Sequence, residues 1–314
     1  MNPGCFAQKI RSPRFAAIAA AITASTLACM AAILLAPANV TIAANVAAKP
    51  KQTASESPVK FDDLLWFVDR AKAAYDTPAE IRERFPNTTR VAQPDGTEVQ
   101  YFLECDELKR RHVVAVRGTA NLTNVFEDLE YLRVDDERLG IAVHRGFHDD
   151  ALAIYTDLKP HLRKDYEIVL TGHSLGAAVS TLLMLYLDQD GFSVARSVNF
   201  GQPKLTNSDG AKRFSRMPLL RVVDHQDVVP TLPTATLLDS IGGLYAHFGD
   251  QITLLDGPRY AFIESEQAWS ASKLSFWKEL GDESLSDHAV SRYEERIRAK
   301  RSGSERVPFK LRVE

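Results

Sequence analysis

Cysteine is nearly absent from this sequence. Three cysteines occur among 314 residues, and two of them, Cys5 and Cys29, fall in an N-terminal segment that is typical of a targeting leader. Only Cys105 remains in the body of the chain, so no disulfide can form within that body even in an oxidising compartment. Cys105 follows a strand-like run, residues 99–104, which predicts a buried structural thiol and not a nucleophile. The body must therefore be held together by packing.

An excess of charge of either sign is also missing. The chain has 38 Lys and Arg residues against 41 Asp and Glu residues, a formal net charge of -3. No basic cluster with interleaved aromatic residues occurs apart from a short charged stretch at residues 293–312, so no nucleic-acid partner is expected. Internal repeats are absent, and 45% hydrophobic residues suffice for the core of one large domain.

The first 48 residues have the composition of an export signal. Three basic residues precede an uncharged stretch, residues 15–48, and Ala36 and Ala38 offer a small-residue cleavage site. Two interpretations fit: a cleaved signal peptide, or a signal anchor, because the apolar part is nearly long enough to span a bilayer. Both predict that the large domain is exported, whether secreted, periplasmic or anchored to a membrane by the N-terminal segment.

The rest of the chain divides into a polar linker at residues 49–60, a domain at residues 61–300 and a charged tail at residues 301–314. Helix and strand patterns alternate along the domain, which predicts an α/β fold with a mainly parallel central sheet flanked by helices. Helices are expected at residues 61–75, from residue 78, at 147–162 and at 175–187; strands are expected at 89–93, 99–105, 112–116, 168–170, 194–200, 219–223 and 251–255.

One segment, residues 166–178, carries the strongest functional signal. An apolar run leads into Gly172-His173-Ser174-Leu175-Gly176, and a long apolar helix pattern follows. A serine hydroxyl is a poor nucleophile unless it is held exposed beside a base, and a strained turn between strand and helix provides that exposure. Gly172 and Gly176 leave room for the turn. Ser174 is therefore the predicted nucleophile.

A nucleophilic serine needs a histidine base, which in this architecture follows it in the chain. Two histidines, His247 and His288, come after the acidic positions that could serve as the third group. His247 precedes a strand-like run, residues 251–255, whereas His288 lies beyond it at the start of a helix pattern. A base that must reach a serine at the edge of a sheet belongs on a loop after the last strand, which favours His288. The other six histidines are interpreted as structural or surface groups.

The acid is expected directly after a strand, and residues 219–223 end in two candidates, Asp224 and Asp227. We favour Asp227, since Val228, Val229 and Pro230 anchor the loop immediately after it, and Asp224 remains the alternative. The carboxylate would orient the imidazole and stabilise the imidazolium that forms during reaction.

Backbone donors for an oxyanion should come from two places. One is Leu175, the residue after the nucleophile, and the other is Thr119, which follows the strand pattern at 113–116 through Arg117 and Gly118. Just beyond, four apolar residues share one face of a helix pattern: Leu122, Val125, Phe126 and Leu129. This helix either packs permanently on the core or acts as a lid that opens at a lipid surface.

In order along residues 61–297, these motifs resemble the class 3 lipases, whose best-known members are the filamentous-fungal triacylglycerol lipases. The matching segments are Arg117-Gly118-Thr119 with Asn124 and Asp128, Val143-His144-Arg145-Gly146-Phe147, Thr171 to Gly176, Asn199-Phe200-Gly201-Gln202-Pro203, Asp227 to Pro233, and Asp287-His288. The resemblance implies an α/β-hydrolase fold, a catalytic triad of Ser174, Asp227 and His288, and an oxyanion hole at Thr119 and Leu175. Val125 replaces the tryptophan of the fungal lid, Thr206 replaces a frequent glycine, and the fungal disulfides are missing.

The implied reaction is hydrolysis of a carboxylic ester of a lipid through an acyl-enzyme, without a metal or organic cofactor. Phospholipase A1 and short-chain carboxylesterase activities stay open, because nothing in the sequence identifies the head group or chain length. An inactive, membrane-tethered binding protein is the alternative from another class. The expected partner is the lipid or ester substrate, at a lipid–water interface if the lid operates, and the sequence leaves the oligomeric state open.

Overall fold

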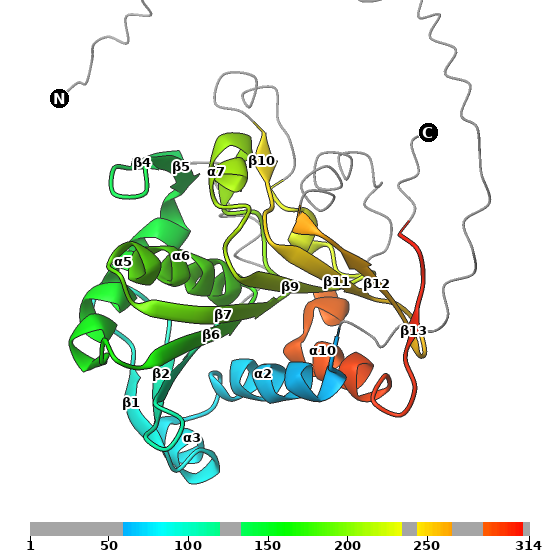
Figure 1. Cartoon of the computed structure of the whole chain (residues 1–314), viewed down its shortest axis with the longest axis horizontal. Coiled ribbons are helices and arrows are strands. Elements are labelled where there is room, and N and C mark those ends of the chain that lie inside the picture. The colour runs from blue at the N-terminus through cyan, green and yellow to red at the C-terminus, as the bar shows by residue number, and fades with distance from the viewer. Residues whose placement is uncertain (1–58, 120–132, 234–243, 266–284, 310–314) are drawn as a thin grey trace, which may run out of the picture. The chain divides into compact units, whose positions relative to one another are not determined.

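A nine-stranded sheet forms the centre of the structure (Figure 1). The computed structural model describes residues 59–119, 133–233, 244–265 and 285–309, which all fall within one unit of contacts, Glu56–Glu314. The predicted leader and nearly all of the predicted linker lie outside the described residues.

The strand order is β1-β2-β3-β6-β7-β9-β11-β12-β13. The strands are β1 (Thr88–Ala92), β2 (Tyr101–Asp106), β3 (Arg111–Val116), β6 (Glu167–His173), β7 (Ser193–Phe200), β9 (Leu219–Asp224), β11 (Asp250–Leu254), β12 (Arg259–Ile263) and β13 (Glu305–Arg306). Pairing is parallel from β3 through β6, β7 and β9 to β11, and antiparallel at β1–β2, β2–β3 and β11–β12. The predicted α/β architecture with a mainly parallel sheet is confirmed.

Helices cover both faces of this sheet (Figure 1). They are α2 (Phe61–Ala73), α3 (Pro78–Arg84), α5 (Arg145–Leu158), α6 (Leu175–Gln189), α7 (Ser208–Arg213) and α10 (Val290–Arg298), with short 3-10 turns at Lys159–His161, Val229–Thr231 and Leu285–His288. Successive strand residues point to opposite faces, so Val113 and Val169 pack with α2 and α10, whereas Val114 and Leu170 pack with α5 and α6. Both faces are thus filled, which suits continuous apolar strands.

Several local predictions are confirmed in detail. Thr77 and Glu80 form a reciprocal capping box at the start of α3, with Pro78 at its first position. The antiparallel β1–β2 pair encloses the predicted turn at residues 94–96.

The helix expected at 147–162 has different bounds in the structure. It begins at Arg145, and its end tightens into a 3-10 turn at Lys159–His161, because Pro160 has no N–H to donate.

The prediction of a buried thiol needs correction. Cys105 is only half-buried, and its Sγ lies 3.2 Å from Oε1 of Glu107. Burial and the neighbouring Glu107 carboxylate raise the pKa of the Cys105 thiol to about 11, so it stays protonated and unreactive at neutral pH. Its side chain lies at the strand end, where β2 leaves the core.

The sequence did not predict a second, four-stranded sheet, nor β12 and β13. The second sheet has the order β10-β8-β5-β4, formed by β10 (Tyr245–Ala246), β8 (Thr206–Asn207), β5 (Ile141–His144) and β4 (Arg133–Asp136).

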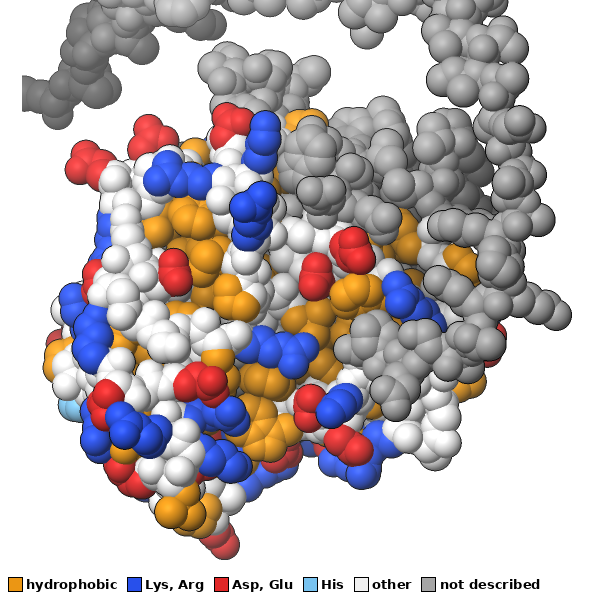
Figure 2. All heavy atoms as spheres, viewed as in Figure 1, with side chains coloured by type: hydrophobic (Ala, Val, Ile, Leu, Met, Phe, Trp, Pro, Cys, Tyr) orange, Lys and Arg blue, Asp and Glu red, His pale blue; other side chains and the backbone are white. Residues whose placement is uncertain are grey.

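No helix among the described residues is long and apolar enough to cross a membrane. On the face drawn in Figure 2, Lys and Arg side chains alternate with Asp and Glu side chains, in keeping with the balanced composition.

The carboxyl ends of four neighbouring parallel strands meet at one edge of the sheet. Thr119 follows β3, Ser174 follows β6, Gly201 follows β7 and Asp227 follows β9. Reactive groups of α/β proteins lie at this edge, since the loops there converge above the strand ends. The fold therefore gathers most of the predicted site residues in one place.

Candidate active site

Ser174 occupies a strained turn between β6 and α6. Its backbone has φ 58° and ψ -131°, a region that residues other than glycine rarely adopt. The turn is fixed by two backbone bonds, from the Ser174 N–H to the carbonyl of Phe200 at 3.0 Å and from the Ala177 N–H to the carbonyl of Ser174 at 2.9 Å. The surrounding structure thus holds the serine in a conformation that it would not adopt alone.

Glycine is required on both sides of this turn. A Cβ at Gly172 would lie under 3.0 Å from the backbone of Gly176, and one at Gly176 would lie equally close to the carbonyl group of Arg117. A Cβ at Gly118 would in turn meet the carbonyl of His173 and the Cβ of Ser174, at 2.9 Å for the latter. The backbone after β3 therefore passes directly over the serine, which brings Thr119 to its side.

Asp227 is held by three hydrogen bonds. Its Oδ1 accepts the N–H of Val229 at 2.8 Å, and its Oδ2 accepts both the Nδ1–H of His288 at 2.7 Å and the hydroxyl of Tyr293 at 2.5 Å. The carboxylate is buried, with 4% of the residue exposed. These donors fix the orientation of the carboxylate toward His288.

Asp224, the alternative acid, has different partners. It is fully buried, forms an ion pair with Arg296 and accepts the N–H of Gln226 at 3.1 Å. Arg296 also donates to Gln226 and, at 2.9 Å, to Asp256, so it ties α10 to the loop that carries Asp227. Burial raises the pKa of the Asp224 carboxyl, while its hydrogen bond and the Arg296 charge oppose that rise. Asp224 also lies 3.3 Å from Nδ1 of His225, but Asp227 is the candidate that is bonded to the predicted base, His288.

His288 ends the 3-10 turn that precedes α10 and is 1% exposed. Its Nδ1 donates to Asp227, so its Nε2 is the acceptor in the neutral ring. Within the described parts of the chain, this buried Nε2 has no hydrogen-bond partner. The imidazole therefore presents an unpaired acceptor, which is the atom that a general base uses.

His173 connects the base to the nucleophile. Its Nε2 donates to the backbone carbonyl of His288 at 2.7 Å, and its ring centroid lies 4.7 Å from that of His288. The hydroxyl of Tyr75 then donates to Nδ1 of His173 at 2.8 Å. Burial, followed by the charge of His288, lowers the pKa of His173 well below its usual value, so it remains neutral. A neutral His173 adds no positive charge beside a base that must itself become charged.

His247, which the sequence analysis set aside as the base, is bonded to the acid loop. Its Nε2 donates to the carbonyl of Pro230 at 2.7 Å, and it is buried after β10. Burial, followed by the charge of Arg221, lowers the pKa of His247 well below its usual value. The contact supports the loop that carries Asp227.

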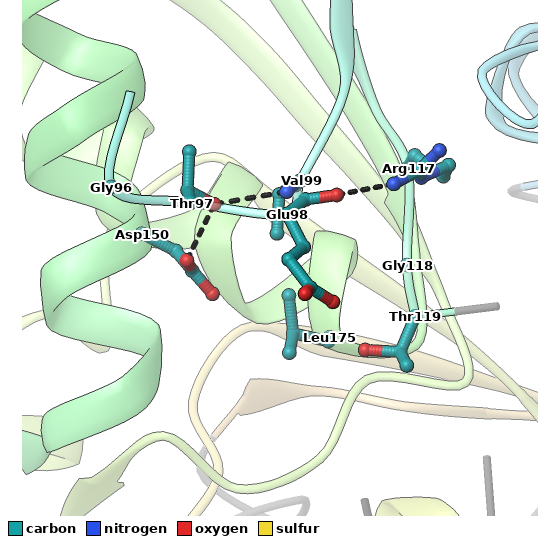
Figure 3. Close-up of a pocket in the computed structure, with 9 residues that line it drawn as sticks. All are labelled: Gly96, Thr97, Glu98, Val99, Arg117, Gly118, Thr119, Asp150 and Leu175. Atoms are coloured by element: carbon teal, nitrogen blue, oxygen red, sulfur yellow. Dashed lines mark hydrogen bonds between the residues drawn. The ribbon is translucent and has the colours of Figure 1, made fainter. Parts of the chain in front are cut away.

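Thr119 and Leu175 line one wall of a cavity of about 640 Å³ (Figure 3). Arg117 and Gly118 continue that wall, and the turn before β2 together with α5 forms the opposite side. The two predicted oxyanion donors are thus neighbours at the mouth of a cavity large enough for part of a lipid molecule. The four residues of the predicted lid, and Asn124 and Asp128, lie outside the described residues.

Sequence reasoning missed three contributors to this arrangement: Tyr75, Tyr293 and Gly201. The two tyrosines carry no local signal, because each reaches the site across the fold. Gly201 was noted only within a motif. Its φ is +59°, and an added Cβ would lie 2.8 Å from Cε1 of His288 and 3.1 Å from Oδ2 of Asp227.

A mainly parallel sheet covered on both faces, a strained serine after a central strand, and an Asp–His pair on later loops together define an α/β-hydrolase with the arrangement of a serine hydrolase. Residues 113–237 match the family model described as lipase (class 3). The matched segment is thus similar to the family that the motifs resemble; it contains Ser174 and Asp227 and ends before His288.

Individual relatives are moderately similar. A phospholipase A1-II 1 of Oryza sativa is 31% identical over 208 residues, covering 56% of this chain and 50% of the relative. A secreted mono- and diacylglycerol lipase 1 of Fusarium solani is 29% identical over 146 residues, covering 44% of each. Diacylglycerol lipase-beta of Mus musculus is 29% identical over 154 residues, covering 45% of this chain and 23% of the relative. The chain thus spans half or less of the length of these relatives.

Solved structures of fungal lipases share the fold. The lipase from Rhizopus microsporus var. chinensis superposes with a TM-score of 0.59 at 20% identity, covering 74% of this chain and 86% of that chain. The triacylglyceride lipase of Rhizomucor miehei superposes with a TM-score of 0.57 at 19% identity, covering 72% and 92%. These similarities confirm the predicted α/β-hydrolase fold.

Proposed function

We propose that this protein is a serine hydrolase that cleaves carboxylic esters of lipids through an acyl-enzyme. The observation that carries the proposal is the buried Asp227–His288 pair, whose Nε2 is unpaired and whose ring packs against His173, the residue before the strained Ser174. The match of residues 113–237 to the family model described as lipase (class 3) supports it. The names of the relatives point to acylglycerols or phospholipids as the substrate class.

In the proposed reaction, Oγ of Ser174 attacks the ester carbonyl while Nε2 of His288 takes the hydroxyl proton. Asp227 keeps the ring oriented through Nδ1–H and stabilises the imidazolium. The backbone N–H groups of Thr119 and Leu175 would bind the oxyanion, and loss of one such donor costs ~3 kcal/mol of barrier in known hydrolases.

The tetrahedral intermediate then collapses. The C–O bond to the alcohol breaks as His288 returns the proton to the leaving oxygen, and the acyl group remains on Ser174. Water attacks the acyl-enzyme in the same way, giving its proton to His288 and its oxygen to the carboxylic acid that is released. The serine recovers its proton from His288, so atoms and charges balance over the cycle.

We also propose export of this domain, as secreted, periplasmic or membrane-anchored protein, with residues 1–48 as its signal peptide or anchor and 61–300 as the catalytic domain. The proposal rests on the basic and apolar pattern of the leader. The Fusarium solani relative, whose name calls it secreted, supports the same location.

Labelling with a fluorescent fluorophosphonate tests the reaction class directly. The wild-type protein is expected to be labelled in a time-dependent manner, and Ser174→Ala is expected to abolish labelling while its thermal unfolding remains similar. Wild-type protein that is folded but unlabelled, and that releases no fatty acid from any ester, would identify a non-catalytic binding protein. Comparing triacylglycerols, diacylglycerols, phospholipids and soluble p-nitrophenyl esters would distinguish a lipase from a phospholipase A1 or an esterase.

A further inference from the structure

The cavity beside the proposed oxyanion donors has acidic groups that the reaction does not use. Glu98 lies in the turn before β2, and Asp150 lies in α5, on the side opposite Thr119 and Leu175. In Figure 3 the Glu98 side chain extends across the cavity toward Leu175 and Thr119. A carboxylate thus points toward the two proposed oxyanion donors.

The second carboxylate is fixed in position. Oδ1 of Asp150 accepts the hydroxyl of Thr97 at 2.6 Å, and that hydroxyl in turn accepts the N–H of Val99 at 2.9 Å. Burial raises the pKa of the Asp150 carboxyl, and the negative charges of Asp149 and Glu98 raise it further. Two acidic side chains, Glu98 and Asp150, thus supply hydrogen-bond acceptors on this side of the cavity.

Arg117 is the cationic residue of the lining. Among the described residues it forms no ion pair with Glu98 or Asp150. Its guanidinium donates to the backbone carbonyl of Glu98, and in Figure 3 it lies away from the Glu98 carboxylate. It ties the turn before β2 to the end of β3, two segments that line the cavity.

These groups discriminate between the two halves of an ester. An acyl chain placed here would strip water from carboxylates without offering a hydrogen bond in return, which is unfavourable. A polyol offers hydroxyl donors that replace those waters, and hydrogen bonds to charged acceptors are among the stronger ones. An anionic head group would be repelled by Glu98 and Asp150.

We infer that the cavity formed by Thr97, Glu98 and Asp150 is the subsite for the alcohol part of the substrate, and that it selects uncharged, hydroxyl-bearing alcohols such as the glyceryl group of a partial acylglycerol. Glu98 is the specificity-determining residue of this subsite. The inference rests on the proposed function and adds to it the chemistry of the leaving group.

A pair of substrates with the same acyl chain tests the subsite. We would measure kcat/KM for 1-monooctanoylglycerol and for methyl octanoate, which form the same acyl-enzyme but release different alcohols. The two alcohols differ in intrinsic reactivity, so the ratio in one enzyme alone does not report on the subsite. The change in this ratio from the wild type to a variant does report on it. In Glu98→Leu the ratio of glyceryl to methyl ester is expected to fall about tenfold, the effect of one lost hydrogen bond to a charged acceptor.

Two further variants make the test specific. Glu98→Gln keeps an acceptor oxygen and is expected to lose less of the preference, while hydrolysis of the anionic ester 1-octanoylglycerol 3-phosphate should rise relative to wild type. Glu83→Gln, which removes an exposed carboxylate on α3, is the matched control and is expected to keep the wild-type ratio. Thermal unfolding of each variant checks that the fold is retained.

An unchanged ratio in both Glu98 variants, in an enzyme that hydrolyses methyl octanoate, would refute the subsite and leave the proposed function standing. If Glu98→Gln lowers kcat/KM for octanoylcholine more than for the glyceryl ester, the cavity selects a cation, and the proposed selection of hydroxyl groups is refuted. If the wild type is not labelled by a fluorophosphonate and cleaves neither ester, the proposed function fails and the subsite fails with it.

Discussion

Gly201 offers a sharp test of the Asp227–His288 pair, because it can be altered without touching either residue. Replacing Gly201 with alanine adds one methyl group whose carbon would lie 2.8 Å from Cε1 and 3.0 Å from Nδ1 of His288. Ordinary van der Waals contact begins at 3.4 Å, so the imidazole must retreat by about 0.6 Å, and displacements approaching 1 Å cost up to ~100-fold in rate. We therefore expect kcat/KM to fall by about 10- to 100-fold.

The same substitution also strains the backbone, and a control separates the two effects. Gly201 has φ +59°, where alanine costs about 1–2 kcal/mol more than glycine. Gly257 has φ +61° but nothing within 4 Å of an added Cβ. Gly257→Ala should therefore lose a similar amount of stability to backbone strain and retain activity.

The assay is hydrolysis of p-nitrophenyl butyrate together with urea unfolding of both variants. A Gly201→Ala enzyme whose kcat/KM stays within about threefold of the Gly257→Ala enzyme would refute the assignment of Asp227 and His288 as the working acid–base pair, because the clash would then have no functional effect.

Three other outcomes follow from the site. His288→Ala is expected to lower kcat by more than ~1000-fold with a similar free energy of unfolding, and substantial remaining turnover would exclude His288 as the base. His247→Gln should affect stability instead: the unfolded chain binds a proton below pH 6.5 that the buried, neutral His247 does not, so stability present above that pH is lost as the pH falls. Urea unfolding should show that the wild type loses about 1.4 kcal/mol more stability than the variant between pH 7.5 and pH 5.5, and equal losses would contradict the lowered pKa. Tyr293→Phe removes the hydroxyl bonded to Asp227 and should cost about 1–3 kcal/mol of stability and about tenfold in kcat; a variant with unchanged kcat would show that Tyr293 supports the fold alone.

The serine turn could be predicted because its constraints are local. Gly172 and Gly176 lie two residues before and two residues after Ser174 and leave room for the turn. The apolar runs on either side predict a strand and a helix without any information from the rest of the chain. The capping box at Thr77 and the β1–β2 hairpin were predictable for the same reason. In each case the physical cause lies within a few residues of its effect.

Contacts across the fold could not be predicted in this way. The sequence places Asp224 and Asp227 equally well after β9, and the choice between them depended on the residues that follow. In the structure the difference is made by distant groups, since Arg296 pairs with Asp224 while His288 bonds to Asp227. The two-residue strands of the second sheet were missed because so short a segment has no periodicity to detect.

The docking of α10 against α2 has a consequence for the time at which activity begins. Lys72 of α2 donates to Glu294 of α10 at 2.7 Å, and the turn just before α10 carries His288. During synthesis the serine turn and the acid loop leave the ribosome well before this last helix. Under the proposed function, a nascent chain would carry the nucleophile without its base, and ester hydrolysis could start only once α10 packs against α2. The cell that makes the protein would thus be protected from its activity until this part of the chain has been synthesised and folded.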